Sequence, residues 1–358
     1  MESTGELAWF RGELTRSLFH PFEFARSLAR EYYGLGLAGV LVAVLAGVAL
    51  SIAVDAMILI AKGFSPFAFI PQVLIDSLFL GIRLAVTVAI VATVAHYAAR
   101  ALRVRELSLE QAFTALSFAL SPFLLAPIAV PFVAVAPELL PIAGVVTVLV
   151  VIRAAIGLAI NLRALLAPAL AVVLFVVMAA TGALVMQDQI SRVRFAGYAV
   201  APQLVPDFAA TPVTGTRFEA TDFTITLPPG WKNATSGVRG EAARYESDVV
   251  SLRVLRAGGL PLSTADSYAD SASIDARQAL QDSWRERSVV RINGVIAVDD
   301  RYGGTYLGRQ VLYRQFTVVP RTSGLALIFH YIDPPDADAA LAEAASIAAT
   351  WQLREESR

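Results

Sequence analysis

Four ionisable residues lie in a part of the sequence that is otherwise almost wholly apolar, and they are the first candidates for chemistry. They are Asp55, Asp76, Arg83 and Arg153. A charge in hydrocarbon is costly, so its position usually reflects pairing, access to water or a function. Two carboxylates held close together raise the pKa of one of them, as a proton relay requires. One hypothesis is therefore that these residues line a polar cavity for an ion, a proton or a small solute.

The competing interpretation of the same residues needs no transport. Asp55 lies near the end of its apolar segment and Asp76 near the start of the next, so both are expected to reach interfacial water. Arg83 lies about 10 Å further along the helix than Asp76, which makes a direct ion pair between them strained. Arg153 can extend its side chain to the cytoplasmic interface. An inverted-repeat transporter shows two related halves, and no repeated half is visible in this sequence.

The remaining chemistry-bearing residues indicate structure rather than catalysis. His330 lies in a predicted strand, where a lone histidine is more often structural than a general base. Asp299 and Asp300, beside Arg301, predict a charged hairpin turn, because the full spacing of a calcium loop is absent. The sequence has no phosphate loop, nucleophile elbow or zinc-binding spacing. We therefore expect no enzymatic activity, no cofactor and no metal.

Long apolar helices must position the four ionisable residues. Residues 34–186 form an apolar block, and a helix needs about 20 apolar residues to cross a bilayer. Short polar or Pro/Gly breaks divide this block into a predicted five-helix transmembrane bundle. The predicted spans are 35–60, 72–97, 112–135, 139–160 and 164–186. The division between the fourth and fifth spans is marked only by Asn161, Arg163 and Pro168.

The basic residues of the short connecting segments predict the orientation of the bundle. They precede the first span and follow the second and the fourth, whereas the opposing loops hold only Lys62. Because Lys and Arg accumulate on the cytoplasmic side, the N-terminus is predicted inside and the region after Met186 outside. This pattern predicts a multipass protein of a bacterial-type cytoplasmic membrane, with an extracytoplasmic C-terminal domain.

The first predicted span carries a row of small residues at every fourth position. The row consists of Gly39, Ala43, Gly47 and Ser51 and leads to Asp55. Small residues let two helices approach closely in a membrane. The row predicts packing inside the bundle, with self-association into a homo-oligomer as the alternative.

Composition limits the remaining function classes. The chain has a net charge of −1 and 16% charged residues, so nothing suggests a nucleic-acid partner. It contains no cysteine, which excludes disulfides and thiolate chemistry. The polar start of the chain lacks the short apolar core of a cleavable signal peptide, so we expect the first span to act as its own insertion signal.

The pattern changes on either side of the apolar block. Residues 1–33 predict a cytoplasmic amphipathic segment, and residues 187–215 a proline-rich linker. Residues 216–354 predict a soluble α+β domain, because alternating strand patterns, among them 289–298 and 309–316, are interrupted by two helical stretches. The first of these starts near Thr264 and carries Ala276, Leu280 and Trp284 at helical spacing; the second follows Pro335. The natural architecture is an antiparallel sheet covered by two helices.

Two family resemblances accompany these patterns. The stretch Pro21-Phe22-Glu23-Phe24, the five predicted spans and the sequence SFALSP at 117–122 resemble the Yip domain family of Ypt/Rab-interacting membrane proteins, over residues 10–186. This resemblance implies a membrane role, associated in eukaryotes with vesicle traffic, and no catalytic residue. The sequence FTITLPPGW at 223–231 resembles the PsbP-like α/β sandwich, whose members mostly bind partners.

Together these features predict a non-enzymatic multipass membrane protein. Its partners are predicted to be the lipid bilayer and, for the C-terminal domain, an envelope protein, a lipid or the cell wall. The alternative function is an ion, proton or small-solute transporter, or a transporter subunit, that uses the intramembrane Asp and Arg residues. An outward-facing sensor is a third hypothesis, although no signalling domain is recognisable in the N-terminal segment.

Overall fold

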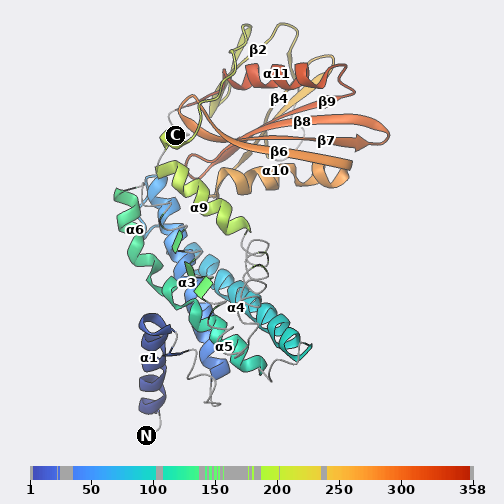
Figure 1. The fold of residues 1–358 in the computed structure, drawn as a ribbon. Helices are drawn as coiled ribbons and strands as arrows, with labels where there is room; N and C mark the ends of the chain where they lie inside the picture. Colours follow the sequence, from blue (N-terminus) through green and yellow to red (C-terminus); the bar gives the residue numbers. More distant parts are fainter. Residues whose placement is uncertain are drawn as a thin grey trace. The chain divides into compact units, whose positions relative to one another are not determined.

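A computed structural model gives the fold of the chain (Figure 1). It describes residues 3–21, 23–24, 35–101, 108–136, isolated residues between 142 and 180, and residues 187–200, 202–234 and 240–354. The chain forms two compact units. The helical unit contains Met1–Met57 and Pro66–Ile190, and the sheet unit contains Ile58–Ser65 and Ser191–Arg358.

The helical unit is built from long apolar helices. The largest are α3 (Leu35–Ala61) and α4 (Ile70–Ala101). A third apolar stretch is divided into α5 (Leu109–Ala119), the 3₁₀ helix η1 (Ser121–Leu125) and α6 (Ala126–Val135). Pro122 and Pro127 stand at the starts of η1 and α6, where a missing backbone N–H costs no helical hydrogen bond. Ser108 begins α5 through a capping box with Gln111.

Three candidate membrane spans occur among the described residues, and they support the predicted membrane character. They are Gly36–Ala61, Ile70–Tyr97 and Leu109–Phe132, each long and apolar enough to cross a bilayer. They correspond to the first three predicted spans. The predicted spans at 139–160 and 164–186 fall almost wholly outside the described residues, so the total of five stays a prediction.

The N-terminal helix α1 (Ser3–Phe19) packs within the helical unit. The Phe10 ring meets the Phe118 ring edge-on, with centroids 6.3 Å apart. The fully buried Ser17 hydroxyl donates a hydrogen bond to Ser121 at 3.1 Å. The part of the predicted amphipathic segment that forms α1 therefore contacts α5 and η1.

The sheet unit is organised around a seven-stranded antiparallel sheet with the order β3-β4-β5-β9-β8-β7-β6. Its strands are β3 (Lys232–Ala234), β4 (Glu241–Glu246), β5 (Val250–Ala257), β6 (Gln281–Ile292), β7 (Val295–Tyr306), β8 (Arg309–Val318) and β9 (Gly324–Ile332). A smaller antiparallel sheet has the order β1-β2-β10, with β1 (Thr216–Glu219), β2 (Phe223–Leu227) and β10 (Gln352–Leu353).

Two helices cover opposite faces of the large sheet (Figure 1). Helix α10 (Ala265–Ala279) packs on β7, β8 and β9, while α11 (Ala337–Ala348) packs on the other face of β8 and β9 and against β2. The main core lies on the α11 side, where Phe316, Phe329 and Trp351 are buried together. The expected antiparallel sheet with two covering helices is confirmed, and the second small sheet is an addition to it.

The region between residues 280 and 300 differs from the sequence expectation. Helix α10 ends at Ala279, so Trp284 lies in β6 and not on a helical stripe with Ala276. The single strand expected at 289–298 is instead a hairpin whose turn is Asn293-Gly294. Both turn residues have positive φ, of 49° and 83°, and Asn-Gly is the preferred pair for such a turn.

Much of the predicted linker is ordered against the sheet unit. Residues 187–200 form α9 (Gln187–Val200), and Phe195 is buried with Ala265 and Ala269 of α10. The 3₁₀ helix η3 (Pro202–Leu204) follows. Further on, the Phe208 N–H donates to Arg291 O at 2.9 Å, and the Arg291 N–H donates to Pro206 O at 2.9 Å. This segment therefore runs along the outer edge of β6.

Candidate functional site

Of the four ionisable residues predicted inside the membrane, three lie on α3 and α4, and Arg153 has a helical conformation. Asp55 of α3 is fully buried, and the Ser51 hydroxyl is 3.5 Å from its carboxylate. Asp76 and Arg83 are half-buried on α4. Arg153 is half-buried in a helical segment, and its Nε has no hydrogen-bond partner among the described residues.

The row of small residues on α3 faces neighbouring helices of the same chain. Ala43 and Ser51 are fully buried. A Cβ at Gly47 would lie 2.7 Å from the Cα of Gly81 on α4, a distance that real Cβ atoms do not show. A Cβ at Gly39 would lie 3.1 Å from the Phe113 ring of α5. The absence of side-chain atoms at Gly47 and Gly81 thus allows the backbones of α3 and α4 to touch.

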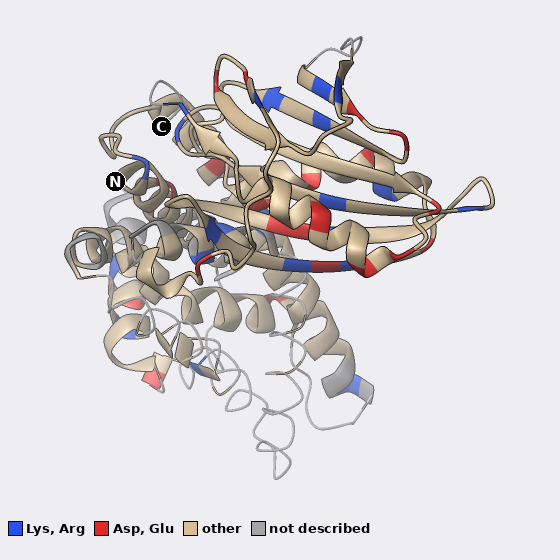
Figure 2. Cartoon of the chain, turned by 90° about the horizontal axis from the view of Figure 1, so that it is seen from above, with Lys and Arg blue, Asp and Glu red and all other residues tan. Residues whose placement is uncertain are grey.

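The sheet unit holds a second set of charged residues, which the sequence did not place together. Figure 2 shows acidic and basic residues next to one another on strands and a helix of this unit. Two arginine–aspartate systems lie on opposite faces of the large sheet. Their centres are Asp299 and Asp300, adjacent residues of β7.

Asp299 pairs with Arg314 of β8 on the face covered by α11. Arg314 Nε and Nη2 donate to the two oxygens of Asp299 at 3.0 and 2.7 Å, and both side chains are almost completely buried. Arg314 Nη1 also donates to Leu341 O in α11, at 2.5 Å. The guanidinium lies 4.9 Å from the Phe316 ring centroid. This bidentate pair fixes α11 on the sheet without leaving a buried charge unpaired.

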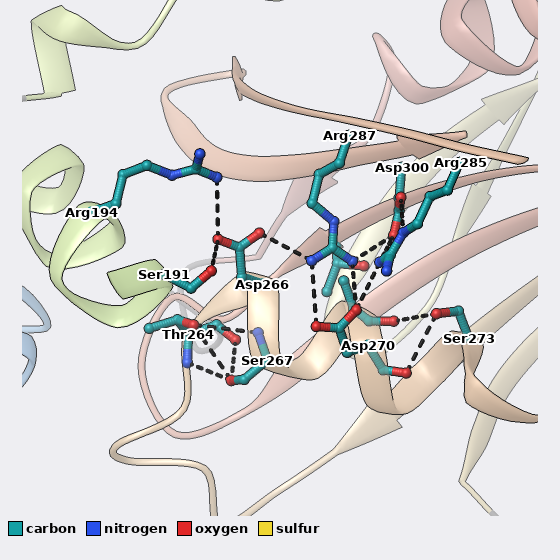
Figure 3. A network of polar contacts seen from close by, with 12 residues as sticks. Ser191, Arg194, Thr264, Asp266, Ser267, Asp270, Ser273, Arg285, Arg287 and Asp300 are labelled. Carbon is teal, nitrogen blue, oxygen red and sulfur yellow. Dashed lines mark hydrogen bonds and ion pairs between the residues drawn. The ribbon is translucent and has the colours of Figure 1, made fainter. Parts of the chain in front are cut away.

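Asp300 faces α10 and accepts hydrogen bonds from two arginines of β6 (Figure 3). Arg285 donates from Nε at 2.8 Å and from Nη2 at 2.5 Å, and Arg287 donates from Nη2 at 2.6 Å. Antiparallel register explains the geometry, because Arg287 is directly opposite Asp300 in the β6–β7 pair. Burial raises the pKa of Asp300 to about 6, an effect that the hydrogen bond from Arg285 opposes.

The same arginines reach two carboxylates of α10, and the system continues to α9 (Figure 3). Asp270 accepts from Arg285 at 2.7 Å and from Arg287 at 3.0 Å. Asp266 accepts from Arg287 at 3.4 Å. Its other oxygen accepts from Ser191 of α9 at 3.2 Å and from Arg194 of α9 at 3.5 Å. We call Asp266, Asp270, Arg285, Arg287 and Asp300 the α10 network.

The α10 network joins three layers rather than opening onto a cleft. Asp266 and Asp300 are buried, and burial raises the pKa of Asp266 as well. A solute can reach the Asp300 carboxylate only after α10 or β6 moves, because the side chain has no exposed surface. In this arrangement the charges hold α9, α10 and β6 together around the buried Asp300 carboxylate, while the Asp270 side chain is half exposed.

The prediction of a charged hairpin turn at Asp299 and Asp300 was wrong. Both residues lie in the middle of β7 and are buried. The turn is instead Asn293-Gly294, seven residues before Asp300. Three signals in the sequence were available: the Asn-Gly pair, the alternation of Arg285 and Arg287, and the position of two acidic residues at a similar distance beyond the turn.

His330 lies in β9, as predicted, and stacks on an aromatic ring. The centroids of its imidazole and of the Tyr313 ring are 4.6 Å apart, and the two ring planes are almost parallel, with an interplanar angle of 8°. Burial lowers its pKa, and the charges of Arg253 and Arg244 lower it further. Among the described residues, no group of three or more His, Cys, Asp or Glu side chains is arranged to hold a metal ion.

A hollow of about 570 Å³ lies elsewhere on the sheet unit, between the β1–β2 turn and β4. Its lining includes the ion pair between Asp222 and Arg256, whose atoms are 2.9 Å apart. Arg244, which also lines it, pairs with Glu246 at 2.8 Å. Charges of both signs are therefore already paired around this hollow.

Comparison with known proteins gives a limited result. No protein-family model matches the chain, and no curated protein matches it. The resemblance to the Yip domain family is therefore not confirmed. Three solved structures resemble part of the chain, and the resemblance is remote.

Three solved structures show this remoteness. A protein from Bacteroides thetaiotaomicron is 15% identical, with a TM-score of 0.30; the match covers 41% of this chain and 51%, about half, of that one. Cyanobacterial PsbP from Synechocystis is 15% identical, with a TM-score of 0.31 and coverage of 39% and 92%. LpqN of Mycobacterium tuberculosis, which is involved in cell envelope biogenesis, is 12% identical, with a TM-score of 0.30 and coverage of 38% and 89%. The matches thus include PsbP-type domains and extend over about 40% of the chain.

Proposed function

We propose that this protein is a non-enzymatic multipass membrane protein that anchors an extracytoplasmic binding domain. The observation that carries the proposal is the division of the chain into a helical unit with candidate membrane spans and a sheet unit with its own core. The partner of the sheet unit is an envelope protein, a lipid or the cell wall. For residues 10–186 we keep the Yip-like bundle as the family hypothesis.

The proposed lack of enzymatic activity is supported by the state of the charged residues. The strongest concentration of carboxylates and guanidinium groups in the sheet unit is paired internally, and its central carboxylate is buried. A general acid or base must come within hydrogen-bond reach of its substrate. Binding through the surface of a rigid domain makes no such demand.

The proposed orientation follows the distribution of basic residues and is open to direct measurement. The chain has no cysteine, so single cysteines introduced by Gly12→Cys and Asp275→Cys can be labelled without background. Both positions are exposed, on α1 and α10 respectively. In intact cells an impermeant maleimide should label the cysteine at 275 and spare the one at 12 until the membrane is permeabilised. The opposite pattern would refute the orientation.

Transport is the second candidate function, and the burial of Asp55 favours it. A fully buried carboxylate within a candidate span requires pairing, water or a function. The double change Asp55→Asn and Asp76→Asn should abolish proton or solute flux in vesicles if these residues form a pathway. Unchanged flux would remove this candidate.

A further inference from the structure

The exposed large apolar side chains of the sheet unit are concentrated at one end of the large sheet. Five of them lie on or beside the strand ends and turns of that end; they are Val249, Trp284, Tyr306, Leu307 and Ile332. Leu307 is the most exposed, at 85%. We call these five residues the sheet-end patch.

Strand register places four of the five members of the sheet-end patch next to one another. Val250 pairs with Tyr331, so Val249 lies beside Ile332, which itself pairs with Val311 of β8. Tyr306 pairs with Arg309, two residues before Val311, and Leu307 occupies the turn between them. Trp284 pairs with Gly303 near the same end of β7, and alternation places its side chain on the other face of the sheet from Tyr306 and Ile332. The patch therefore follows the ends of β5, β9, β8 and β7, with Trp284 on β6 behind them; Figure 1 shows this end of the sheet, where β7 connects to β8.

The backbone at Leu307 indicates that this leucine is not there for the turn. Leu307 and Gly308 have φ values of 48° and 77°, in the left-handed region. Asn or Gly at the first position would fit this turn with less strain. The Leu307 side chain, 85% exposed, also packs against little of its own chain. Strained and exposed residues of this kind are concentrated at functional surfaces.

Acidic residues flank the sheet-end patch. Asp248 precedes Val249 in the β4–β5 turn, and Asp282 precedes Trp284 by two residues; neither forms an ion pair with a described residue. The nearby Arg309 is neutralised by Asp333, with its Nε 2.7 Å from the carboxylate. The flanks are therefore net negative. An anionic membrane surface would repel them, whereas a basic protein surface would attract them.

We propose that the sheet-end patch is the docking surface for a protein whose own contact surface has apolar residues flanked by Lys and Arg. This inference rests on the proposed binding function and assigns it to one place. The apolar centre supplies area that is removed from water, and the two unpaired carboxylates select a partner of opposite charge. The hollow near β4 lies at the other end of the strands and serves as a reference surface.

The test uses the full-length chain in its native membrane. The photo-crosslinker p-benzoylphenylalanine replaces Leu307 in one variant and the exposed Ala242, beside the hollow, in another. We expect a discrete adduct with a different protein from position 307 and none from position 242. Mass spectrometry of the adduct should identify a contacted peptide with apolar residues flanked by Lys or Arg. The double change Asp248→Lys and Asp282→Lys should lower the adduct yield about tenfold, as a loss of about 1.4 kcal/mol would.

A second variant separates docking from folding. With the crosslinker at position 306, Leu307→Asn should leave the melting temperature of the protein unchanged or higher, because Asn tolerates a positive φ. The adduct yield should nevertheless fall about tenfold. An unchanged yield would overturn the proposal.

The remaining outcomes distinguish the two proposals. An adduct with lipid, with a second copy of this chain or with an acidic protein overturns the docking inference. A protein adduct from position 242 alone leaves the binding function standing and shows that the sheet-end patch is not its surface. If neither position yields an adduct, the binding function and the docking inference both fail.

Discussion

Asp299 and Asp300 are neighbours in β7, yet their carboxylates lie on opposite faces of the sheet and fix different helices. Asp299 binds Arg314, which donates to Leu341 O in α11, and Asp300 binds Arg285 and Arg287 below α10. Alternation along a strand makes this division inevitable once both residues are in β7. One dipeptide therefore connects both helical layers to the central sheet.

The first prediction concerns the central carboxylate of the α10 network. Asp300→Ala leaves Arg285 and Arg287 partly buried without their main partner, and breaking such a pair costs about 3–5 kcal/mol. The control is Asp275→Ala, which removes an exposed carboxylate from α10. Urea denaturation of residues 191–358 should show a large decrease in the free energy of unfolding for Asp300→Ala and almost none for Asp275→Ala. Equal stabilities would mean that the network contributes nothing to folding.

The second prediction concerns the segment before the sheet unit. Phe195 packs on α10, Ser191 donates to Asp266, and Phe208 pairs with the edge of β6. A fragment of residues 191–358 should therefore be more stable than one of residues 215–358, by about 2 kcal/mol for the buried Phe195 alone. Thermal melts of the two purified fragments measure the difference. Identical melting temperatures would show that α9 does not pack on this unit in solution.

The third prediction concerns Asn293, which has two roles in the β6–β7 turn. Its positive φ suits the turn, and its Nδ2 donates to Ala349 O at 3.1 Å and to Trp351 O at 2.6 Å, next to the end of α11. Asn293→Gly keeps the backbone conformation and removes both hydrogen bonds, at about 0.5–1.5 kcal/mol each. Asn293→Val should lower the free energy of unfolding more than Asn293→Gly does, because a β-branched residue at positive φ is strained. Equilibrium unfolding that ranks the valine variant as the more stable would contradict this account.

The fourth prediction concerns pH. Burial and the charges of Arg253 and Arg244 lower the pKa of His330 from 6.5, so the folded state binds its proton less readily than the unfolded state. Its contribution to stability is complete above pH 6.5 and is lost as the pH falls through this region. Asp300 acts in the opposite sense, because its raised pKa, about 6, makes stability fall as the pH rises from 3.8 to about 6.

A paired comparison isolates the histidine. The pH profiles of the free energy of unfolding are measured for the native fragment and for His330→Phe, which keeps an aromatic ring beside Tyr313. Both proteins retain Asp300, so its contribution cancels in the difference. The native fragment should lose stability relative to the variant between pH 7 and pH 5. A constant difference would show that His330 does not titrate differently in the two states.

Single helices and strands with a regular apolar pattern were predictable from the sequence. The pairings between residues distant in the sequence were not. The apolar runs identified α3 and α4, and the alternation at 309–316 identified β8, because burial dictates residue type along a single element. The helical spacing of Ala276, Leu280 and Trp284 was misleading, since it continued across the end of α10 at Ala279. The β6–β7 register, and with it the α10 network, depends on the Asn293-Gly294 turn, which the predicted single strand at 289–298 did not contain.

The last prediction concerns the contact between α3 and α4. A Cβ at Gly47 would lie 2.7 Å from Gly81 Cα and 3.0 Å from Leu80 O, and backbone atoms cannot rotate away as a side chain can. Gly47→Ala must therefore separate the helices, at about 1–3 kcal/mol for overpacking. Gly12→Ala is the matched control, because no atom lies within 4 Å of the added Cβ on α1 and alanine favours the helix.

A Cβ at Gly81 would lie 2.8 Å from Val44 O, so Gly81→Ala should act like Gly47→Ala. Melting of the full-length protein in detergent should show a lower melting temperature for both of these variants and an unchanged one for Gly12→Ala. If Gly47→Ala instead melted like the native protein while altering self-association, the row of small residues would face a second copy of the chain and not α4.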